Sequence, residues 1–242
     1  MRTPVMSIMF LLIPLGACAQ VGEHRNSFSL GVNAGYVLSD VGFDPKVAQT
    51  MHSGVTGGLS MRYICEKYFS TICSIYGEVN YASTGWKQKI ETIDEKPVTN
   101  SNGNTERYSR TTNYIQIPIM AHLAWGKEQQ GFNFFIQAGP QIGIFLSEST
   151  SKNYDTPNLS ENGRSNTIVA QESMDIENKF DYGIAFGGGA EYSHRRLGHF
   201  LLEARYYYGL GNIYGSSKSD YFGKSNFGNI VVKATYLIDL TK

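Results

Sequence analysis

Charged side chains recur at alternate positions inside otherwise apolar segments of this sequence. Glu203 and Arg205 lie two residues apart, so on an extended strand both point to the same side. A carboxylate beside a cation can act as a catalytic acid or base, or the two can form an ion pair that only stabilises the fold. Buried charges cost several kcal/mol unless they are paired, which favours the ion pair. The residues with this placement are Arg62, Glu78, Asp181, Glu191, Glu203, Arg205, Lys233 and Asp239.

Two other features could carry chemistry, and each has a simpler explanation. His122 could serve as the general base of a hydrolase, but no motif places a serine with it, and a hydrogen-bonded interior histidine is favoured. The run 187–189 is three glycines without the lysine or the following helix of a phosphate-binding loop. It is better explained as a strand so crowded that no Cβ fits. We therefore expect no catalytic residue.

The histidines and cysteines show no spacing typical of a zinc site, so we expect no metal and no cofactor. Cys65 and Cys73 leave two alternatives open, a disulfide in an oxidising compartment or two unpaired thiols. Residues 194–196 read His-Arg-Arg and fall in an expected turn. A solvated turn is favoured there over contact with an anionic headgroup or a partner.

Alternation of apolar and polar residues, the period-two pattern of a strand, predicts the elements that position these groups. It is clear in four segments, 28–38, 180–192, 200–210 and 230–240, and weaker in four others, 55–64, 74–81, 114–125 and 132–146. The even count of eight suits a small antiparallel up-and-down transmembrane β-barrel. We predict this all-β fold, with the apolar face towards lipid and the charged face inside.

The connections between these segments support the same fold. Four are long and polar, 39–53, 83–112, 148–178 and 211–228, and three are short, 65–70, 126–131 and 194–198. Long and short connections alternate along the chain, as in outer-membrane barrels with long outer loops and short periplasmic turns. On the apolar face, Tyr36, Trp125, Tyr192 and Tyr208 fit the aromatic girdles of such barrels. A soluble calycin-like barrel is the alternative, but its ligand-facing interior would be apolar.

The composition and the N-terminus agree with export to a membrane. The chain of 242 residues has 21 basic and 21 acidic side chains, and only 17% of its residues are charged. This balance removes the electrostatic argument for nucleic acid as a partner. Residues 1–19 read as a signal peptide, with an apolar run at 5–15 and small residues at 17–19. Cleavage before an acylated Cys18 is the alternative. Residues 20–242 are then the barrel domain.

Several motifs, in the right order, resemble the PorT-like outer-membrane β-barrel family, a group of small porin-like barrels of Gram-negative bacteria. The matching segments are 77–81 (GEVNY), 85–87 (GWK), 114–118 (YIQIP), 137–140 (QAGP), 180–183 (FDYG), 187–192 (GGGAEY), 202–206 (LEARY) and 208–213 (YGLGNI). The resemblance implies a barrel fold and an outer-membrane location. Some members are tied to protein secretion, but many have no assigned role.

The functional expectation is a non-enzymatic outer-membrane barrel that is structural or binds partners through its long surface loops. Its expected partners are outer-membrane lipid and other envelope or secretion proteins. The alternative is a barrel enzyme acting on lipid or peptide, with His122 as the base. Passage of small solutes is a third hypothesis, which the side-chain-filled interior of eight strands disfavours.

Overall fold

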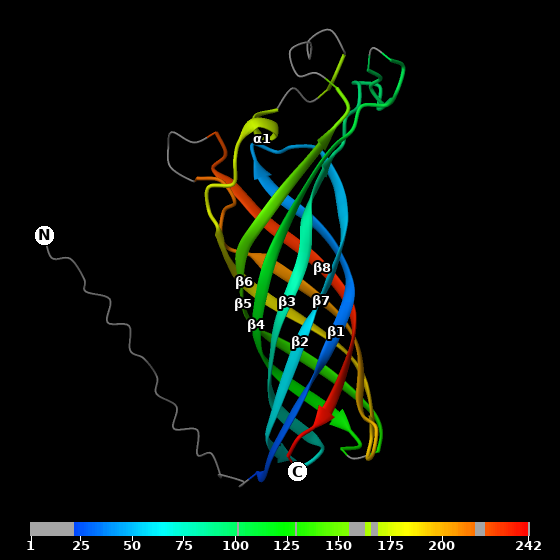
Figure 1. Cartoon of the computed structure of the whole chain (residues 1–242), viewed down its shortest axis with the longest axis vertical. Helices are drawn as coiled ribbons and strands as arrows, with labels where there is room; N and C mark the ends of the chain where they lie inside the picture. Colours follow the sequence, from blue (N-terminus) through cyan, green and yellow to red (C-terminus); the bar gives the residue numbers. More distant parts are fainter. Residues whose placement is uncertain are drawn as a thin grey trace, which may run out of the picture.

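The eight-stranded barrel is confirmed by the computed structural model. It describes residues 22–100, 102–128, 130–154, 163–165, 169–215 and 221–241. Its strands are β1 (Glu23–Asp44), β2 (Gln49–Tyr68), β3 (Thr71–Gln88), β4 (Tyr108–Gly126), β5 (Gly131–Lys152), β6 (Phe180–His194), β7 (Gly198–Gly209) and β8 (Lys224–Asp239). Each strand pairs antiparallel with the next, and β8 pairs with β1, so the sheet has no open edge (Figure 1).

Helix contributes almost nothing to this fold. The short α1 (Ala170–Ser173) lies in the connection between β5 and β6. In the described ranges, no helix is long and apolar enough to cross a membrane. The expected signal peptide, residues 1–19, and the lipidation alternative at Cys18 lie outside the described residues.

The outer surface of the barrel is an apolar band. Its members are aliphatic and aromatic side chains at alternate strand positions, such as Val32 at 55%, Phe134 at 68% and Leu202 at 61% exposure. Aromatic rings on neighbouring strands also contact one another outside the barrel, as Phe200 and Tyr236 do with centroids 4.8 Å apart. The four aromatic residues expected in the girdles, Tyr36, Trp125, Tyr192 and Tyr208, are all exposed. This surface suits a hydrocarbon layer.

The strands extend well beyond the expected segments at one end, which we term the loop end (top of Figure 1). The prediction of a long loop at 39–53 is wrong, because residues 45–48 alone join β1 and β2. Apolar and polar residues still alternate there, but the apolar side chains now point inward and the polar ones outward. Val41 and Phe43 point inward and are buried, while Asp40 and Asp44 lie on the other face. Beyond lipid the outer face meets water, so apolar side chains turn inside.

The same reversal shortens the other three long connections. The chain between strands is reduced to 89–107, 153–179 and 210–223. At the opposite end, which we term the turn end, the connections are short: 69–70, 127–130 and 195–197. Phe69 takes a positive φ of 49° in the first of these turns. The barrel therefore has one end of extended strands and long loops and one end of tight turns.

Glycine on β6 makes room for the charged side chains of β7. Gly187 pairs with Arg205, and Gly189 pairs with Glu203. A Cβ on Gly189 would overlap the carbonyl oxygen of Leu202 and lie 2.9 Å from Cζ of Phe135. As the sequence indicated, these glycines belong to a tightly packed strand and not to a phosphate-binding loop.

We predict that Gly189→Ala lowers the free energy of unfolding by about 1–3 kcal/mol, because the added methyl group overpacks the interior. Urea unfolding of the barrel in lipid vesicles measures this. The matched control is Gly223→Ala, where a Cβ meets nothing within 4 Å. Equal stability of the two variants would show that the interior wall is not crowded.

Candidate functional site

Four charged side chains form a central cluster in the middle of the barrel. They are Glu78 from β3, Glu203 and Arg205 from β7, and Lys233 from β8. The Arg205 guanidinium lies 2.9 Å from Glu78 and 2.7 Å from Glu203. Lys233 forms an ion pair with Glu78 and lies 3.4 Å from Glu203. The two carboxylates and two cations balance, and all four side chains are at most 3% exposed.

Register explains how the central cluster forms. Lys233 lies directly across from Glu203 on β7 and from Gly35 on β1. A side chain at position 35 would occupy the space that Lys233 uses. Two amides add hydrogen bonds to the carboxylates: Gln137 donates to Glu203 at 2.7 Å, and Asn80 donates to Glu78 at 2.9 Å.

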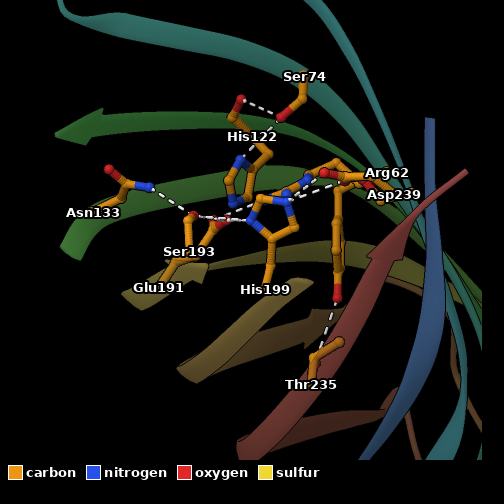
Figure 2. Close-up of polar contacts among 11 residues, drawn as sticks. Arg62, Ser74, His122, Asn133, Glu191, Ser193, His199, Thr235 and Asp239 are labelled. Atoms are coloured by element: carbon orange, nitrogen blue, oxygen red, sulfur yellow. Dashed lines mark hydrogen bonds and ion pairs between the residues drawn. The ribbon is translucent and has the colours of Figure 1, made fainter. Parts of the chain in front are cut away.

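A second balanced set, the turn-end cluster, lies closer to the tight turns. It consists of Arg62, Glu191, His199 and Asp239 (Figure 2). Arg62 Nη1 donates to Glu191 at 2.7 Å. His199 Nδ1 lies 2.7 Å from Glu191 Oε1, and its Nε2 lies 3.1 Å from Asp239 Oδ1. Both ring nitrogens face carboxylate oxygens, so the protonated imidazolium, which donates from both, fits this site.

This histidine has the surroundings of a catalytic relay but not the protonation state that one needs. Ser193 Oγ lies 2.9 Å from His199 Nδ1, and Asp239 lies on the far side of the ring. A general base must accept the serine proton. The imidazolium form of His199, which the two facing carboxylates favour, cannot accept that proton, and Ser193 Oγ donates to Glu191 at 3.0 Å. Ser193 is also fully buried, so a substrate carbonyl has no access to it.

His122, the residue that the sequence singled out as a candidate base, is enclosed. Its ring stacks on Phe135, with centroids 4.6 Å apart, and faces Tyr76 at 5.8 Å. Its Nδ1 lies 3.1 Å from Oγ of Ser74, a serine that no motif indicated. His122 is 1% exposed, so the geometry supports an interior structural role.

Asp181 lies apart from both clusters. Its carboxylate accepts a hydrogen bond of 2.7 Å from the Tyr207 hydroxyl, and no ion pair to it is found in the described part of the chain. The structure thus divides the eight expected charges into two balanced sets plus Asp181. The sequence interpretation missed His199 and Ser193, although both share the inward parity of their strands.

The cysteines are free thiols in the structure. Cys73 pairs with Glu66, and Cys65 falls in the irregularity between Ile64 and Glu66, next to this pair. Within the described ranges, no group of three His, Cys, Asp or Glu side chains could hold a metal ion.

Three charged residues form a clasp across the turn end of the barrel. Glu128, between β4 and β5, lies 2.5 Å from Arg25 on β1 and 3.1 Å from Lys67 on β2. Burial alone would raise the pKa of the Glu128 carboxyl, but the hydrogen bonds from Arg25 and Lys67 outweigh it and lower that pKa below its ordinary value. The clasp therefore stabilises the ionised carboxylate at neutral pH.

At the loop end, an aromatic group closes the interior. Phe43 contacts Trp86 with ring centroids 5.5 Å apart and Phe222 at 4.9 Å, and Tyr214 stacks on Phe222 at 5.8 Å. We term these four rings the loop-end cap. Trp86, Tyr214 and Phe222 have no exposed surface. The cap gives the outer loops a core of their own.

Arg110 ties the loops to this cap. Its guanidinium lies 5.6 Å from the Trp86 ring centroid and 2.6 Å from Glu148 on β5. It also donates to the carbonyl oxygens of Gln171 and Met174, at 3.0 and 2.6 Å. The segment around α1 is thereby fixed to β4 and β5 by one buried side chain.

Comparison with known proteins identifies a family whose model matches this sequence. The family model for the outer membrane protein beta-barrel domain matches residues 18–215. No curated protein matches the sequence. Several solved structures are similar to this chain, including the following three. One is Ail, the attachment invasion locus protein of Yersinia pestis, in complex with the heparin analogue sucrose octasulfate, at 14% identity. It covers 88% of this chain and 100% of its own, with a TM-score of 0.38.

The other two are also outer-membrane proteins. The outer membrane protein OprG from Pseudomonas aeruginosa is 12% identical, with coverage of 90% of this chain and 98% of its own and a TM-score of 0.40. The outer membrane enzyme PagL is 13% identical, with coverage of 85% and 99% and a TM-score of 0.40.

We predict that Arg205→Met lowers the free energy of unfolding by about 3–5 kcal/mol, because it leaves the central cluster with an uncompensated buried carboxylate. The double variant Glu203→Gln/Arg205→Met restores neutrality and should recover part of this loss. Urea unfolding in lipid vesicles gives both values. Lys46→Ala, an exposed control, should be near neutral. A double variant no more stable than Arg205→Met would contradict the charge-balance argument.

The clasp predicts a pH dependence. Because the pKa of Glu128 is lower in the folded state than in the unfolded chain, its stabilisation is present at neutral pH and disappears as the pH falls from about 4.5 through the folded value. Glu128→Gln should therefore cost about 1 kcal/mol or less near pH 7 and less than that near pH 3. Unfolding curves at both values measure the difference. The exposed control Glu177→Gln should show no such trend; a constant cost at all pH values would refute the clasp.

Proposed function

The chain belongs to the outer membrane protein beta-barrel domain family, and we propose that it is a non-enzymatic barrel that binds a partner through its outer loops. The protein resides in the outer membrane, and its apolar band is the surface that meets lipid. Orientation follows the rule for such barrels, with the tight turns in the periplasm and the long loops outside. The closer assignment to the PorT-like group rests on the ordered motifs of the sequence.

The observation that carries this proposal is the internal order of the loops. The Arg110 guanidinium holds carbonyl oxygens of the α1 region, and a buried pair between Arg164 and Glu106 joins two different loops. The Arg164 guanidinium also lies 4.2 Å from the Tyr154 ring centroid. Loops that serve only as connections do not need buried ion pairs. A fixed surface binds partners with less loss of entropy.

The exposed face of these loops offers groups for recognition. A polar groove of about 590 Å³ is lined by Asn100, Asn102, Gly103, Asn104, Thr105, Arg107 and Asn153. Asn100 accepts from the backbone N–H groups of Asn102 and Asn104, at 3.0 and 2.9 Å, which fixes this turn. Ile93, in a separate turn of the same loop, is 86% exposed. A loop with both hydrogen-bonding groups and an exposed apolar side chain suits a protein partner.

The interior supports neither of the other hypotheses. His122 is enclosed, and both ring nitrogens of His199 face carboxylate oxygens, which disfavours either residue as the base of a hydrolase. The largest fully buried side chains, including Trp86, Tyr76 and Lys233, lie inside the barrel. An interior filled in this way disfavours solute passage.

We predict that a photo-crosslinking residue at Ile93 in intact cells gives a discrete protein adduct. The same residue at Phe132, in the lipid band, should give none. Arg110→Gln should abolish the adduct at Ile93 without unfolding the barrel, because it releases the loops from the cap. Gel mobility of heated and unheated samples reports the folded barrel, and the labelled bands report the adduct.

Two results would overturn the proposal. One is the absence of any adduct at Ile93 and at Asn104, the second loop position. The other is hydrolysis of lipid or peptide by the purified barrel that is lost in His122→Ala or Ser193→Ala. Protection of both loop positions from protease added to intact cells would contradict the orientation.

A further inference from the structure

A cavity lies at the turn end, away from the loops. It has a volume of about 390 Å³, within the range of small-molecule sites. Its lining residues come from the ends of β1, β2, β6, β7 and β8 and from two tight turns: Arg25, Ser27, Ile64, Glu128, His194, Arg195, His199 and Asp239. The clasp and the turn-end cluster therefore meet at this cavity.

The two acidic groups of the lining are already neutralised. Glu128 is held by Arg25 and Lys67. Asp239 accepts from Ser29 at 2.7 Å and from the ring of His199. Neither carboxylate therefore offers an unused charge to a cationic ligand.

One cation of the lining has no such partner. Arg195 is exposed in the β6–β7 turn, and no ion pair from it to a carboxylate occurs among the described residues. The neighbouring Arg196 is exposed in the same turn but does not line the cavity. Arg195 is thus the one arginine of the lining whose charge no carboxylate among the described residues balances. Guanidinium groups bind carboxylates and phosphates in bidentate geometry.

We propose that this cavity is a binding site for a small oxyanion, a carboxylate or phosphate group, with Arg195 as its main ligand. The volume exceeds that of the anion alone, so an organic body can accompany it. Ile64 supplies an apolar contact for that body. In the orientation proposed above, the ligand enters from the periplasm, either as a free small anion or as the carboxylate end of a peptide.

The test uses the purified barrel in detergent micelles at low salt, so it does not depend on the orientation or on the loops. The probes are inorganic phosphate, acetyl-Gly-Ala with a free carboxylate, and the same peptide as its amide. Backbone amide shifts of Arg195 and His199 in NMR titrations give the dissociation constants. We expect saturable binding of phosphate or of the free acid, and none of the amide.

The matched variants are Arg195→Gln and Arg196→Gln, which remove the same charge from adjacent exposed positions. Arg195→Gln should weaken binding about 10-fold, the scale of a lost charge-assisted bidentate contact. Arg196→Gln should change it less than about 2-fold, since it loses only long-range attraction. Tighter binding of the peptide acid than of phosphate assigns the site to a peptide carboxylate. The reverse order assigns it to a free anion.

Three outcomes would overturn the site. They are the lack of saturable binding to the wild-type barrel, equal weakening by the two variants, and equal binding of the peptide acid and amide. Loss of the Ile93 adduct in cells would leave this result untouched, so the two proposals fail separately.

Discussion

Exclusion of water from the barrel interior requires each ionised group there to find a partner of opposite charge, and most of the interior follows from this requirement. The central cluster balances two carboxylates with two cations, and the turn-end cluster does the same once His199 is protonated. The glycines of β1 and β6 give these side chains the space to cross the interior. On the outer face, the same strands carry the apolar band that meets lipid.

Strand parity could be predicted from the sequence because lipid and interior select opposite residue types in strict alternation. It identified eight strands and which charged residues point inward. It failed at the loop end, where the outer face meets water and the polarity of the alternation reverses, as Val41 and Phe43 show. The sequence prediction assumed that the apolar residues of every strand face outward, so it assigned these ends of the strands to loops.

The ion-pair partner of each charged side chain inside the barrel could not be predicted, because the paired residues come from strands far apart in sequence. Glu78 meets Arg205 across 127 positions and Lys233 across 155. The balance of charges among the expected inward residues was a signal that the sequence prediction did not use. The eight expected residues include five carboxylates and three cations, so further hydrogen-bond donors were required. His199 and Tyr207 are those donors, and both occupy inward positions of β7.

The dependence of the central cluster on β8 has a consequence for assembly of the barrel. The Glu78 carboxylate enters the interior with β3, but Lys233 arrives only with the last strand. Until β8 joins β1, a buried glutamate lacks one of its two cations and the sheet has two open edges. Pairing of β8 with β1 therefore closes the sheet and completes the charge balance of the central cluster together. A chain without β8 would keep two open edges and a carboxylate short of one cation.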